Sequence, residues 1–473
     1  MAQSPSIWNF GHNIALKPSA YYEPRDENEL LDILNRHPGE QIRAIGSLHS
    51  WSAAPACEGV VICLKHLQQC HFPAEHAGEE VTVGAGCQIK TLLEYLRRHG
   101  KTLPSVGLIT EQTIAGAIST GTHGSGRHSL SHYVEAVRVA RFDQATGKAF
   151  IEQIDSGEVL QAARCSLGCL GIILAVRIRC RDLYRIEEHW REHADIDAAL
   201  AAEKEFPLQQ LFLVPWRWTL LAQHRRESSA PRSRLAGLYR VYWFLCIDLG
   251  MHLLLILAAR WLQSASLVRL LLRSLIPAAV IRGWKVTDES SAMLVMKHEL
   301  FRHIETEIFI EARHLPAALA HFREVLTVAA DVPESRGFRS AMTTAETEAL
   351  EALRGTYCHH YPICVRRVLA DDTLISMAAG KETIWYTISL ISYARPTDRQ
   401  GFQLVATYLM KTMADKFQAR PHWGKWLSLP PQSLVSLYPH FPTFRDTCQS
   451  RDPAGVFRNA WLSSLMDDQP CRR

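Results

Sequence analysis

Residues 43–52 read Arg-Ala-Ile-Gly-Ser-Leu-His-Ser-Trp-Ser, and this short stretch decides how the rest of the chain is interpreted. The apolar residues at its start are typical of a strand, and Gly46 and Ser47 then turn the chain tightly. Small residues at such a turn let backbone N–H groups approach an anion closely, as phosphate-binding loops do. By itself the stretch predicts a phosphate-binding turn that is followed by a histidine, His49.

Two later motifs extend this interpretation. Gly121-Thr-His-Gly-Ser-Gly126 is a second run of small residues, and Arg420-Pro-His-Trp-Gly-Lys425 lies near the C-terminus. Two glycine loops followed by a basic, aromatic motif suggest a phosphate-bearing cofactor that the N-terminal half holds. The reacting side chains are then expected from the C-terminal half.

The overall composition limits the classes of function. A chain of 473 residues exceeds one ordinary core, which predicts at least two domains. The net charge of +4 arises from 52 basic and 48 acidic residues without a long basic block, so we expect no nucleic-acid partner. The 22 histidines form no metal-like tract, and the 12 cysteines show no C-x-x-C pair, so we expect no metal.

The cysteines and the N-terminal residues bear on localisation. Scattered single cysteines are typical of buried free thiols in a reducing compartment. The first residues, Met-Ala-Gln-Ser-Pro-Ser, lack the basic start and apolar core of a signal peptide. We therefore expect a cytoplasmic protein.

The apolar periodicity predicts a mixture of helices and strands. Short apolar runs alternate with amphipathic helices in the first part of the chain, and further strands and a long helix follow the middle of the chain. This pattern predicts the α+β class. We expect helices at 24–37, 89–99, 315–329 and 402–417, and strands at 134–142, 172–180, 304–310, 365–369 and 383–391.

The segment 237–281 is unusually apolar. Its first run is interrupted by Asp248, His252 and Arg260, and no second clear span follows. Three interpretations remain open for 241–281: buried or groove-lining helices, which we favour, an element that lies on a membrane surface, or a membrane-spanning helix.

Taken together, the motifs carry a family resemblance. Gly168-Cys-Leu-Gly-Ile172, Leu437-Tyr-Pro and Asp452-Pro-Ala-Gly-Val-Phe-Arg-Asn459 complete a set that is collinear over nearly the whole chain. The chain resembles FAD flavoproteins of the vanillyl-alcohol oxidase type, in the aldonolactone and alditol oxidase branch that includes D-arabinono-1,4-lactone oxidase and L-gulonolactone oxidase. The resemblance implies a two-subdomain FAD-binding PCMH-type domain (1–183), a cap domain of antiparallel sheet flanked by helices (184–410, including the apolar helical segment 237–281), and a C-terminal segment (411–473) that returns to the FAD site.

The resemblance also implies FAD as the cofactor. His49 takes the position of a histidine that is often bonded covalently to the flavin methyl carbon, and the alternative is that His49 only packs on the flavin edge. The loops on both sides would contact the rest of the cofactor. The implied FAD-binding residues are Gly46, Ser47, Leu48, His49, Ser50, Thr113, Gly116, Ser119, Thr120, His123, Gly171 and Ile172.

Three residues are the implied catalytic groups. Lys425 would stabilise the anionic reduced flavin, Arg366 would bind the substrate hydroxyl, and His422 would orient the site or act as a base. For Arg366 the alternative is a simple ion pair with Asp371.

The implied substrate contacts are Cys364, Thr387 and Glu307. The family has a Glu-x-Arg pair on one strand and His-x-Thr on the next. Here Cys364 stands in place of the glutamate and Trp385 in place of the histidine. Both departures leave the substrate open.

The resulting hypothesis is an FAD-dependent oxidase or dehydrogenase that acts on CH–OH donors. It would oxidise a sugar-derived lactone or polyol by hydride transfer to flavin N5, and O₂ or another acceptor would reoxidise the flavin. A second hypothesis is a related enzyme that acts on a lipid or sterol-like substrate at a membrane surface, which the segment 241–281 favours. A third is a binding protein that retains only the fold, and the intact His49, Arg366 and Lys425 argue against it.

Overall fold

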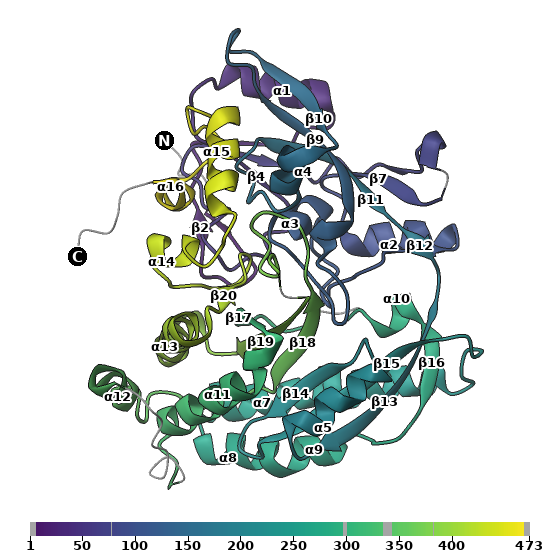
Figure 1. Cartoon of the computed structure of the whole chain (residues 1–473), viewed down its shortest axis with the longest axis vertical. Coiled ribbons are helices and arrows are strands. Elements are labelled where there is room, and N and C mark those ends of the chain that lie inside the picture. The colour runs from purple at the N-terminus through teal and green to yellow at the C-terminus, as the bar shows by residue number, and fades with distance from the viewer. Residues whose placement is uncertain (1–5, 77, 297–299, 334–342, 382, 468–473) are drawn as a thin grey trace.

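The computed structural model describes residues 6–76, 78–296, 300–333, 343–381 and 383–467. Figure 1 shows the N-terminal domain in the upper part of the molecule, the large sheet of the cap domain below it, and the C-terminal helices beside both. This α+β arrangement is the fold class expected from the sequence.

The N-terminal domain contains two main sheets. The first is parallel, in the order β3 (Ala20–Tyr22), β5 (Val60–Cys63) and β4 (Ile42–Ile45). The second is antiparallel, in the order β10 (Ala149–Ile154), β9 (Val134–Phe142), β11 (Ile172–Arg179), β7 (Glu80–Gly84) and β6 (Cys70–His71). Strand β4 ends directly before Gly46, so the parallel sheet positions the first glycine loop. The short strands β1 (Ile7–Trp8), β2 (Ala15–Leu16), β8 (Lys101–Thr102) and β12 (Arg181–Asp182) form two small ribbons.

The helices of this domain follow their sequence signals. Helix α1 (Glu27–Arg36) begins after Asp26, whose side chain accepts a hydrogen bond from the N–H of Glu29. The apolar stripe of α2 (Ile89–Arg98) is buried, as an amphipathic helix on a sheet requires. The expected helices at 24–37 and 89–99 are therefore confirmed. Two shorter helices complete the domain, α3 (Ile114–Ser119) and α4 (Gly157–Arg164).

The cap domain is built on an eight-stranded sheet in which neighbouring strands are antiparallel. Its edge strand β20 comes from the C-terminal segment. The expected strands at 304–310, 365–369 and 383–391 all belong to it. The order is β16 (Val286–Glu289), β13 (Arg185–His193), β15 (Thr219–Ser228), β14 (Gln210–Val214), β18 (Ile363–Leu369), β19 (Ile384–Ser392), β17 (Ile304–Glu311) and β20 (Arg420–Pro421).

The two faces of this sheet differ in polarity because side chains alternate along each strand. On one face, apolar residues such as Leu211, Val365 and Ile388 pack on α11 (Leu315–Ala329) and α13 (Gln400–Phe417). Burial of each such side chain contributes about 1.5–3 kcal/mol to folding. The opposite face carries most of the polar residues, together with apolar ones such as Phe212 and Leu221, and turns toward the N-terminal domain and the apolar helices. Further helices are α5 (Ile196–Ala201), α10 (Ser290–Met293), α12 (Thr344–Glu351), α14 (Pro431–Val435), α15 (Phe441–Arg451) and α16 (Ala460–Met466).

The apolar segment forms helices over the polar face of the sheet. One continuous helix runs through α6 (Ala236–Tyr242), η4 (Trp243–Met251), α7 (His252–Ile256) and η5 (Leu257–Trp261), with π-helical turns in η4 and η5. A second follows through α8 (Ala265–Leu270), η6 (Leu271–Leu275) and α9 (Ile276–Ala279). Among the described residues, Ala236–Trp261 is the one helix with the length and mean hydropathy (2.0) of a membrane span, and 22% of its most apolar window is buried.

The favoured interpretation of this segment, a pair of buried or groove-lining helices, is therefore confirmed only in part. Leu255 and Leu272 pack inward against Trp190 and Leu221 of the sheet. Other large apolar side chains, among them Leu253, are exposed. The segment lines a cavity on one side, as expected of groove-lining helices, but it is not a buried pair.

The C-terminal segment lies against the first glycine loop. The N–H of Ile42 donates to the carbonyl of Val456 at 2.8 Å, and the N–H of Trp51 donates to the carbonyl of Gly424 at 2.9 Å. Arg43 is buried and donates to the carbonyl of Leu167 at 2.7 Å. These bonds hold the motif at 420–425 beside the motif at 43–52.

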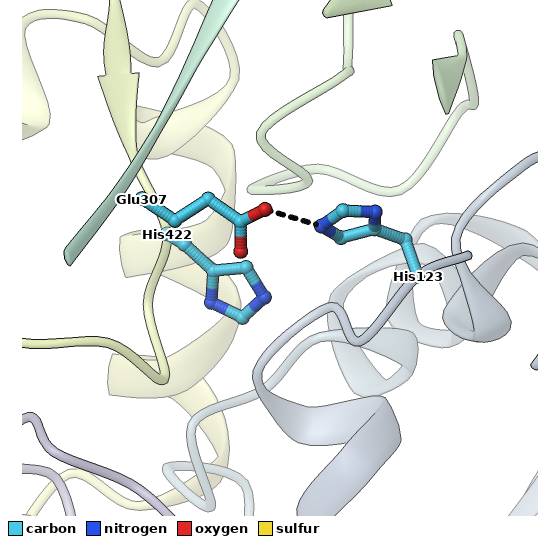
Figure 2. A group of neighbouring side chains, drawn as sticks. All are labelled: His123, Glu307 and His422. Atoms are coloured by element: carbon cyan, nitrogen blue, oxygen red, sulfur yellow. Dashed lines mark ion pairs between the residues drawn. The ribbon is translucent and has the colours of Figure 1, made fainter. Parts of the chain in front are cut away.

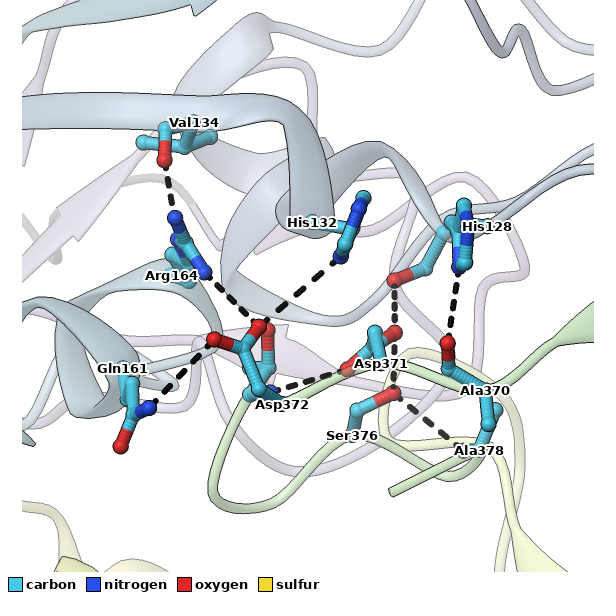
Figure 3. A network of polar contacts seen from close by, with 12 residues as sticks. His128, His132, Val134, Gln161, Arg164, Ala370, Asp371, Asp372, Ser376 and Ala378 are labelled. Carbon is cyan, nitrogen blue, oxygen red and sulfur yellow. Dashed lines mark hydrogen bonds and ion pairs between the residues drawn. The ribbon is translucent and has the colours of Figure 1, made fainter. Parts of the chain in front are cut away.

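A polar network joins the N-terminal domain to the loop after β18 (Figure 3). Asp371 accepts hydrogen bonds from the hydroxyls of Ser129 at 2.7 Å and Ser376 at 2.9 Å, and Arg164 donates to Asp372 at 2.9 Å. The alternative in which Arg366 pairs with Asp371 is wrong for the described residues, because hydroxyl groups satisfy this carboxylate instead.

Candidate active site

A cavity of about 240 Å³ lies between the glycine loops of the N-terminal domain and the polar face of the cap sheet. The implied catalytic residues Arg366, His422 and Lys425 line it, and so does Glu307. The fold thus brings the two expected sets together. The cavity is also lined by every residue that the resemblance implied for FAD: Gly46, Ser47, Leu48, His49, Ser50, Thr113, Gly116, Ser119, Thr120, His123, Gly171 and Ile172.

The glycine loops have the geometry that a dinucleotide needs. A Cβ atom on Gly46 would lie 2.1 Å from Thr113 Oγ1, so only glycine fits there. Gly171 has a φ of +127°, and a Cβ atom on it would lie 2.6 Å from the carbonyl oxygen of Ala140. The N–H groups of Ser47 and Leu48 donate no hydrogen bond within the described part of the chain. The small residues and the available amides fit a diphosphate.

His49 lines the cavity with its ring stacked on Phe10, at a centroid distance of 4.9 Å and an interplanar angle of 17°. Burial, together with the proximity of His303 and Lys425, lowers the pKa of His49 to about 4. The ring is therefore neutral at physiological pH and has one nitrogen lone pair. This is the form of imidazole that can bond to carbon.

A buried carboxylate, that of Glu307 on β17, lies between His123 and His422 (Figure 2). Glu307 accepts a hydrogen bond from the hydroxyl of Ser389 at 2.9 Å, and His123 Nε2 lies 3.3 Å from its Oε1. Burial opposes ionisation of Glu307, but the close contact with His123 and the proximity of His422 and Lys425 hold the pKa of this carboxyl well below its usual range. Glu307 is thus an anion that donor groups surround.

One hydrogen bond decides the tautomer of His422. The backbone N–H of Gly424 donates to His422 Nδ1 at 2.9 Å, so that nitrogen carries no proton. Burial lowers the pKa of His422 to about 3, so the neutral ring carries its proton on Nε2.

This tautomer bears on the possibility of a metal ion. His123, Glu307 and His422 offer ligand atoms that all lie within 4.8 Å of one another, as in a metal site. The protonated Nε2 of neutral His422 is a hydrogen-bond donor rather than a ligand, however, so the cluster fits a proton network better than a cation.

Lys425 is held beside the first loop. Its ammonium group donates to Glu305 and lies 4.6 Å from the centre of the Trp51 ring. Burial alone would raise the pKa of Glu305, but Lys425 and His303 lower it to about 2. Burial would likewise lower the pKa of the Arg366 guanidinium, and nearby acidic groups, with Cys364 the largest and Glu307 next, raise it instead. Two fixed cations therefore face the cavity.

Two of the implied substrate contacts lie behind the cavity surface. Cys364 is buried, and Gln210 donates a hydrogen bond to its sulfur at 2.9 Å. Thr387 is fully buried on β19, paired in register with Arg366. Direct contact of Cys364 or Thr387 with a substrate would require movement, whereas Glu307 lines the cavity directly. Trp385 is buried under the guanidinium of Arg420, at 4.4 Å.

Sequence reasoning missed several lining residues. Glu305 could have been found, because it is two residues from Glu307 on a strand and therefore shares its face. Trp51 stands within the first motif and was given no role. Asp248, His252 and Tyr361 also reach the cavity. In the sequence Asp248 and His252 stood out only as polar interruptions of an apolar run, because their place at the cavity depends on how the apolar helix packs.

A second chamber of about 600 Å³ adjoins the first. Leu108, Asp248, His252, Met296 and Tyr361 line both, so these residues form the neck between the two. The chamber lies between the polar face of the sheet and the apolar helices. Most of its lining is apolar, with Trp190, Phe212, Leu221, Trp243, Phe244, Leu245, Ile247, Met251, Ile276 and Val280.

Family models match both parts of the chain. The model for D-arabinono-1,4-lactone oxidase matches residues 223–465, and a model for an FAD binding domain matches residues 18–150. The second range contains the two glycine loops that line the cavity. FAD, the cofactor expected from the sequence, is supported by this match.

Several relatives are similar over nearly their whole length. A long-chain alcohol oxidase from an uncultured marine euryarchaeote is 53% identical over 470 residues, which cover 99% of this chain and 98% of the relative. L-gulonolactone oxidase from Bos taurus is 24% identical over 471 residues, with 97% of each chain covered. A solved structure of a solvent-stable cholesterol oxidase shares the fold with a TM-score of 0.75 at 15% identity, covering 98% of this chain and 97% of that one.

Proposed function

This chain belongs to the D-arabinono-1,4-lactone oxidase family of FAD-dependent oxidases that act on CH–OH groups, and within that family we propose that it oxidises the hydroxyl of a long-chain alcohol. The observation that carries the proposal is the largely apolar chamber of about 600 Å³ that opens through a neck into the FAD cavity. The hydroxyl groups of a polyol or a sugar lactone would find few hydrogen-bond partners in this mostly apolar lining. An alkyl chain would bury its apolar surface there, at about 0.8 kcal/mol per CH₂ group.

The relatives support the same choice of substrate. The relative at 53% identity is named a long-chain alcohol oxidase, whereas the relatives named for a sugar lactone or an alditol are 23–34% identical. The sugar-derived substrate that was first expected from the sequence is therefore the weaker of the two hypotheses. The lipid-directed alternative, which rested on the segment 241–281, is the stronger.

The residues of the cavity have distinct proposed roles. The glycine loops would hold FAD, which would supply the acceptor for the hydride from the carbon that bears the hydroxyl, with O₂ or another acceptor as the final oxidant. Lys425 and Arg366 hold positive charge where negative charge develops. Glu307 receives the hydroxyl proton, and the Nε2–H of His422 donates a hydrogen bond to the same oxygen. The neck residues keep the alkyl chain out of water.

A substrate panel tests this proposal. Under anaerobic conditions we expect 1-alkanols of increasing length to bleach the visible absorption of the flavin, with kcat/KM rising along the series. A tetradecanol should exceed a hexitol or an aldonolactone by a factor on the order of 100 or more, because each buried CH₂ adds to binding. Faster reduction by the hexitol or the lactone would contradict the proposal.

A covalent bond between His49 and the flavin is a further proposal, supported by the neutral ring that lines the cavity. Acid precipitation of the wild-type protein should leave the yellow flavin in the pellet. The variant His49→Ala should bind FAD but release it into the supernatant on precipitation, because no bond to carbon remains. Complete release of flavin from the wild type would mean that His49 only packs against it.

We also propose that the enzyme works at a membrane surface, where long-chain alcohols accumulate. The polar residues Asp248 and His252 of the long apolar helix face the cavities, so its outer side is apolar. The exposed fractions there reach 65% for Trp261. A helix with its polar residues inward and its apolar residues outward suits contact with lipid. This location is the peripheral alternative to a purely cytoplasmic protein.

Vesicle binding tests the proposed membrane contact. The triple variant Leu253→Gln, Leu257→Gln and Trp261→Gln should reduce sedimentation with phospholipid vesicles at least about tenfold, because three exposed apolar side chains no longer enter the lipid. Activity on an alcohol dissolved in detergent should remain. Both readouts together separate a surface contact from a damaged site.

The matched control changes apolar residues that are equally exposed elsewhere. Trp8, Tyr21 and Leu404 have exposed fractions of 50%, 41% and 43% and lie outside the apolar helices. Their replacement by glutamine should leave vesicle binding unchanged. Equal loss of binding in both triple variants would contradict a specific contact through 241–281.

A further inference from the structure

A row of polar side chains crosses the sheet beneath the apolar helices. Strand register pairs Glu188 with Arg225, Gln223 with Gln210, and Gln210 with Arg366. Directly paired residues share a face, and residues two apart on a strand share it too. The row therefore continues from the active site, at Arg366, along the floor of the chamber.

Burial of these polar groups in the chamber lowers the stability of the folded protein. The exposed fractions are 2% for Glu188, 7% for Arg225, and 5% for both Gln210 and Gln223, and all four line the chamber. Arg225 donates to Glu188 at 2.6 Å, which makes a neutral ion pair. Buried polar groups cost free energy unless they are paired, and apolar residues of similar size would serve a plain alkyl chain better.

Among the described residues, Gln223 has no hydrogen-bond partner that would offset the cost of its burial. Its side-chain amide makes no hydrogen bond to any residue that the structure describes, although only 5% of the residue is exposed to solvent. It lies two residues from Arg225 on the same face of β15. An amide carries both a donor and an acceptor, so it is equipped to bind a hydroxyl group inside the chamber.

We propose that Gln223, next to the Glu188–Arg225 pair, binds a second oxygen of the substrate, so that the preferred substrates are long-chain α,ω-diols. The inference rests on the proposed oxidation of long-chain alcohols. The Glu188–Arg225 pair is neutral, so the site suits a neutral hydroxyl rather than a free carboxylate. One hydroxyl is oxidised in the cavity that the glycine loops line, while the other is held by Gln223 in the chamber.

The length of the row sets the length of the diol. Four strand steps separate Glu307 on β17 from Gln223 on β15. At about 4.8 Å per step this is about 19 Å between backbones. An extended chain advances about 1.2 Å per bond, so a diol of about 10–14 carbons bridges the two ends once the side chains are subtracted.

The test compares 1-tetradecanol with 1,14-tetradecanediol by anaerobic flavin reduction of the holoenzyme in detergent. After division by two for the equivalent hydroxyls, kcat/KM of the wild type should favour the diol about 10- to 100-fold, because a site that binds a hydroxyl rejects an analogue that lacks it. Gln223→Leu should remove this preference and improve the simple alcohol.

Two further variants control for general damage to the chamber and for instability of the leucine variant. Leu221→Met, on the same strand and face, should keep the preference for the diol because it changes no polar group. Gln223→Met provides a second apolar replacement if the leucine variant is unstable. Equal kcat/KM per hydroxyl in the wild type, with the simple alcohol oxidised, would overturn the diol inference and leave the proposed function intact. Oxidation of neither compound would overturn both.

Discussion

Replacement of Lys425 by methionine is expected to slow reduction of the flavin by a long-chain alcohol about 100- to 1,000-fold while FAD remains bound. A fixed cation that faces developing negative charge in a buried site typically contributes about 3–4 kcal/mol to the transition state. Lys425 is fixed by Glu305 and by the ring of Trp51 on the edge of the cavity. Rapid-mixing spectroscopy without oxygen measures the rate, and the absorbance of the purified protein measures the bound FAD.

The single variant has one structural cost, because it leaves the buried carboxylate of Glu305 without its partner. The double variant Lys425→Met/Glu305→Gln removes that charge and should show the same slow reduction with better thermal stability. Lys411→Met, at an exposed position of α13, is the matched control and should reduce normally. Loss of FAD in parallel with the loss of rate would show that Lys425 serves binding of the cofactor instead.

The cofactor site was largely predictable from the sequence because its residues are local. His49 and Gly46 belong to one turn, and His123 belongs to another, so their roles follow from short motifs and from the resemblance that the motifs carry. The turn conformations depend on a few neighbouring residues, such as the contact between Gly46 and Thr113. Contacts between neighbouring residues of this kind can be predicted without knowledge of the fold.

The substrate side could not be predicted in the same way because it depends on strand register. Cys364 was expected to contact the substrate, but its pairing partner on β14 is Phe212, and its sulfur lies under Gln210. The chamber combines β13, β14, β15 and the apolar helix, which are far apart in sequence. A shift of one residue in any of these strands would exchange the polar row for the apolar face.

The apolar segment was predicted only in part, because its exposure depends on its packing in the fold. Its hydropathy alone fits a core helix, a span or a surface helix. The packing of Leu255 inward and Leu253 outward shows that the helix is not fully buried, which its hydropathy could not show. Asp248 and His252, which had argued against a span, are the residues that reach the cavities.

Mild acid is expected to destabilise the folded protein strongly. Burial lowers the pKa of His252, His321 and His360 to about 4 and that of His422 to about 3, from an ordinary value of 6.5. Between these values the unfolded chain binds protons that the folded chain does not, so stability is complete above pH 6.5 and decreases as the pH falls toward 4. Each such group steepens the slope by up to about 1.4 kcal/mol per pH unit in the middle of the window, and His49, His132 and His224, whose pKa burial also lowers to about 4, contribute in the same way. Asp248 opposes this trend, because burial raises its pKa to about 6 and protonation relieves it.

Thermal unfolding at a series of pH values between 7.5 and 4.5 measures the effect. His321 tests the cause, because it lies away from the cavity and its Nε2 is 2.8 Å from the hydroxyl of Thr412. His321→Gln retains a group that can bond to this hydroxyl but removes the titration, so the slope of the free energy of unfolding against pH should become shallower by about 1.4 kcal/mol per pH unit in this window. His71→Gln, at an exposed site, should leave it unchanged. A melting temperature that stays constant down to pH 4.5 would mean that these histidines can take up protons without unfolding, which requires water or a carboxylate to reach them inside the folded protein.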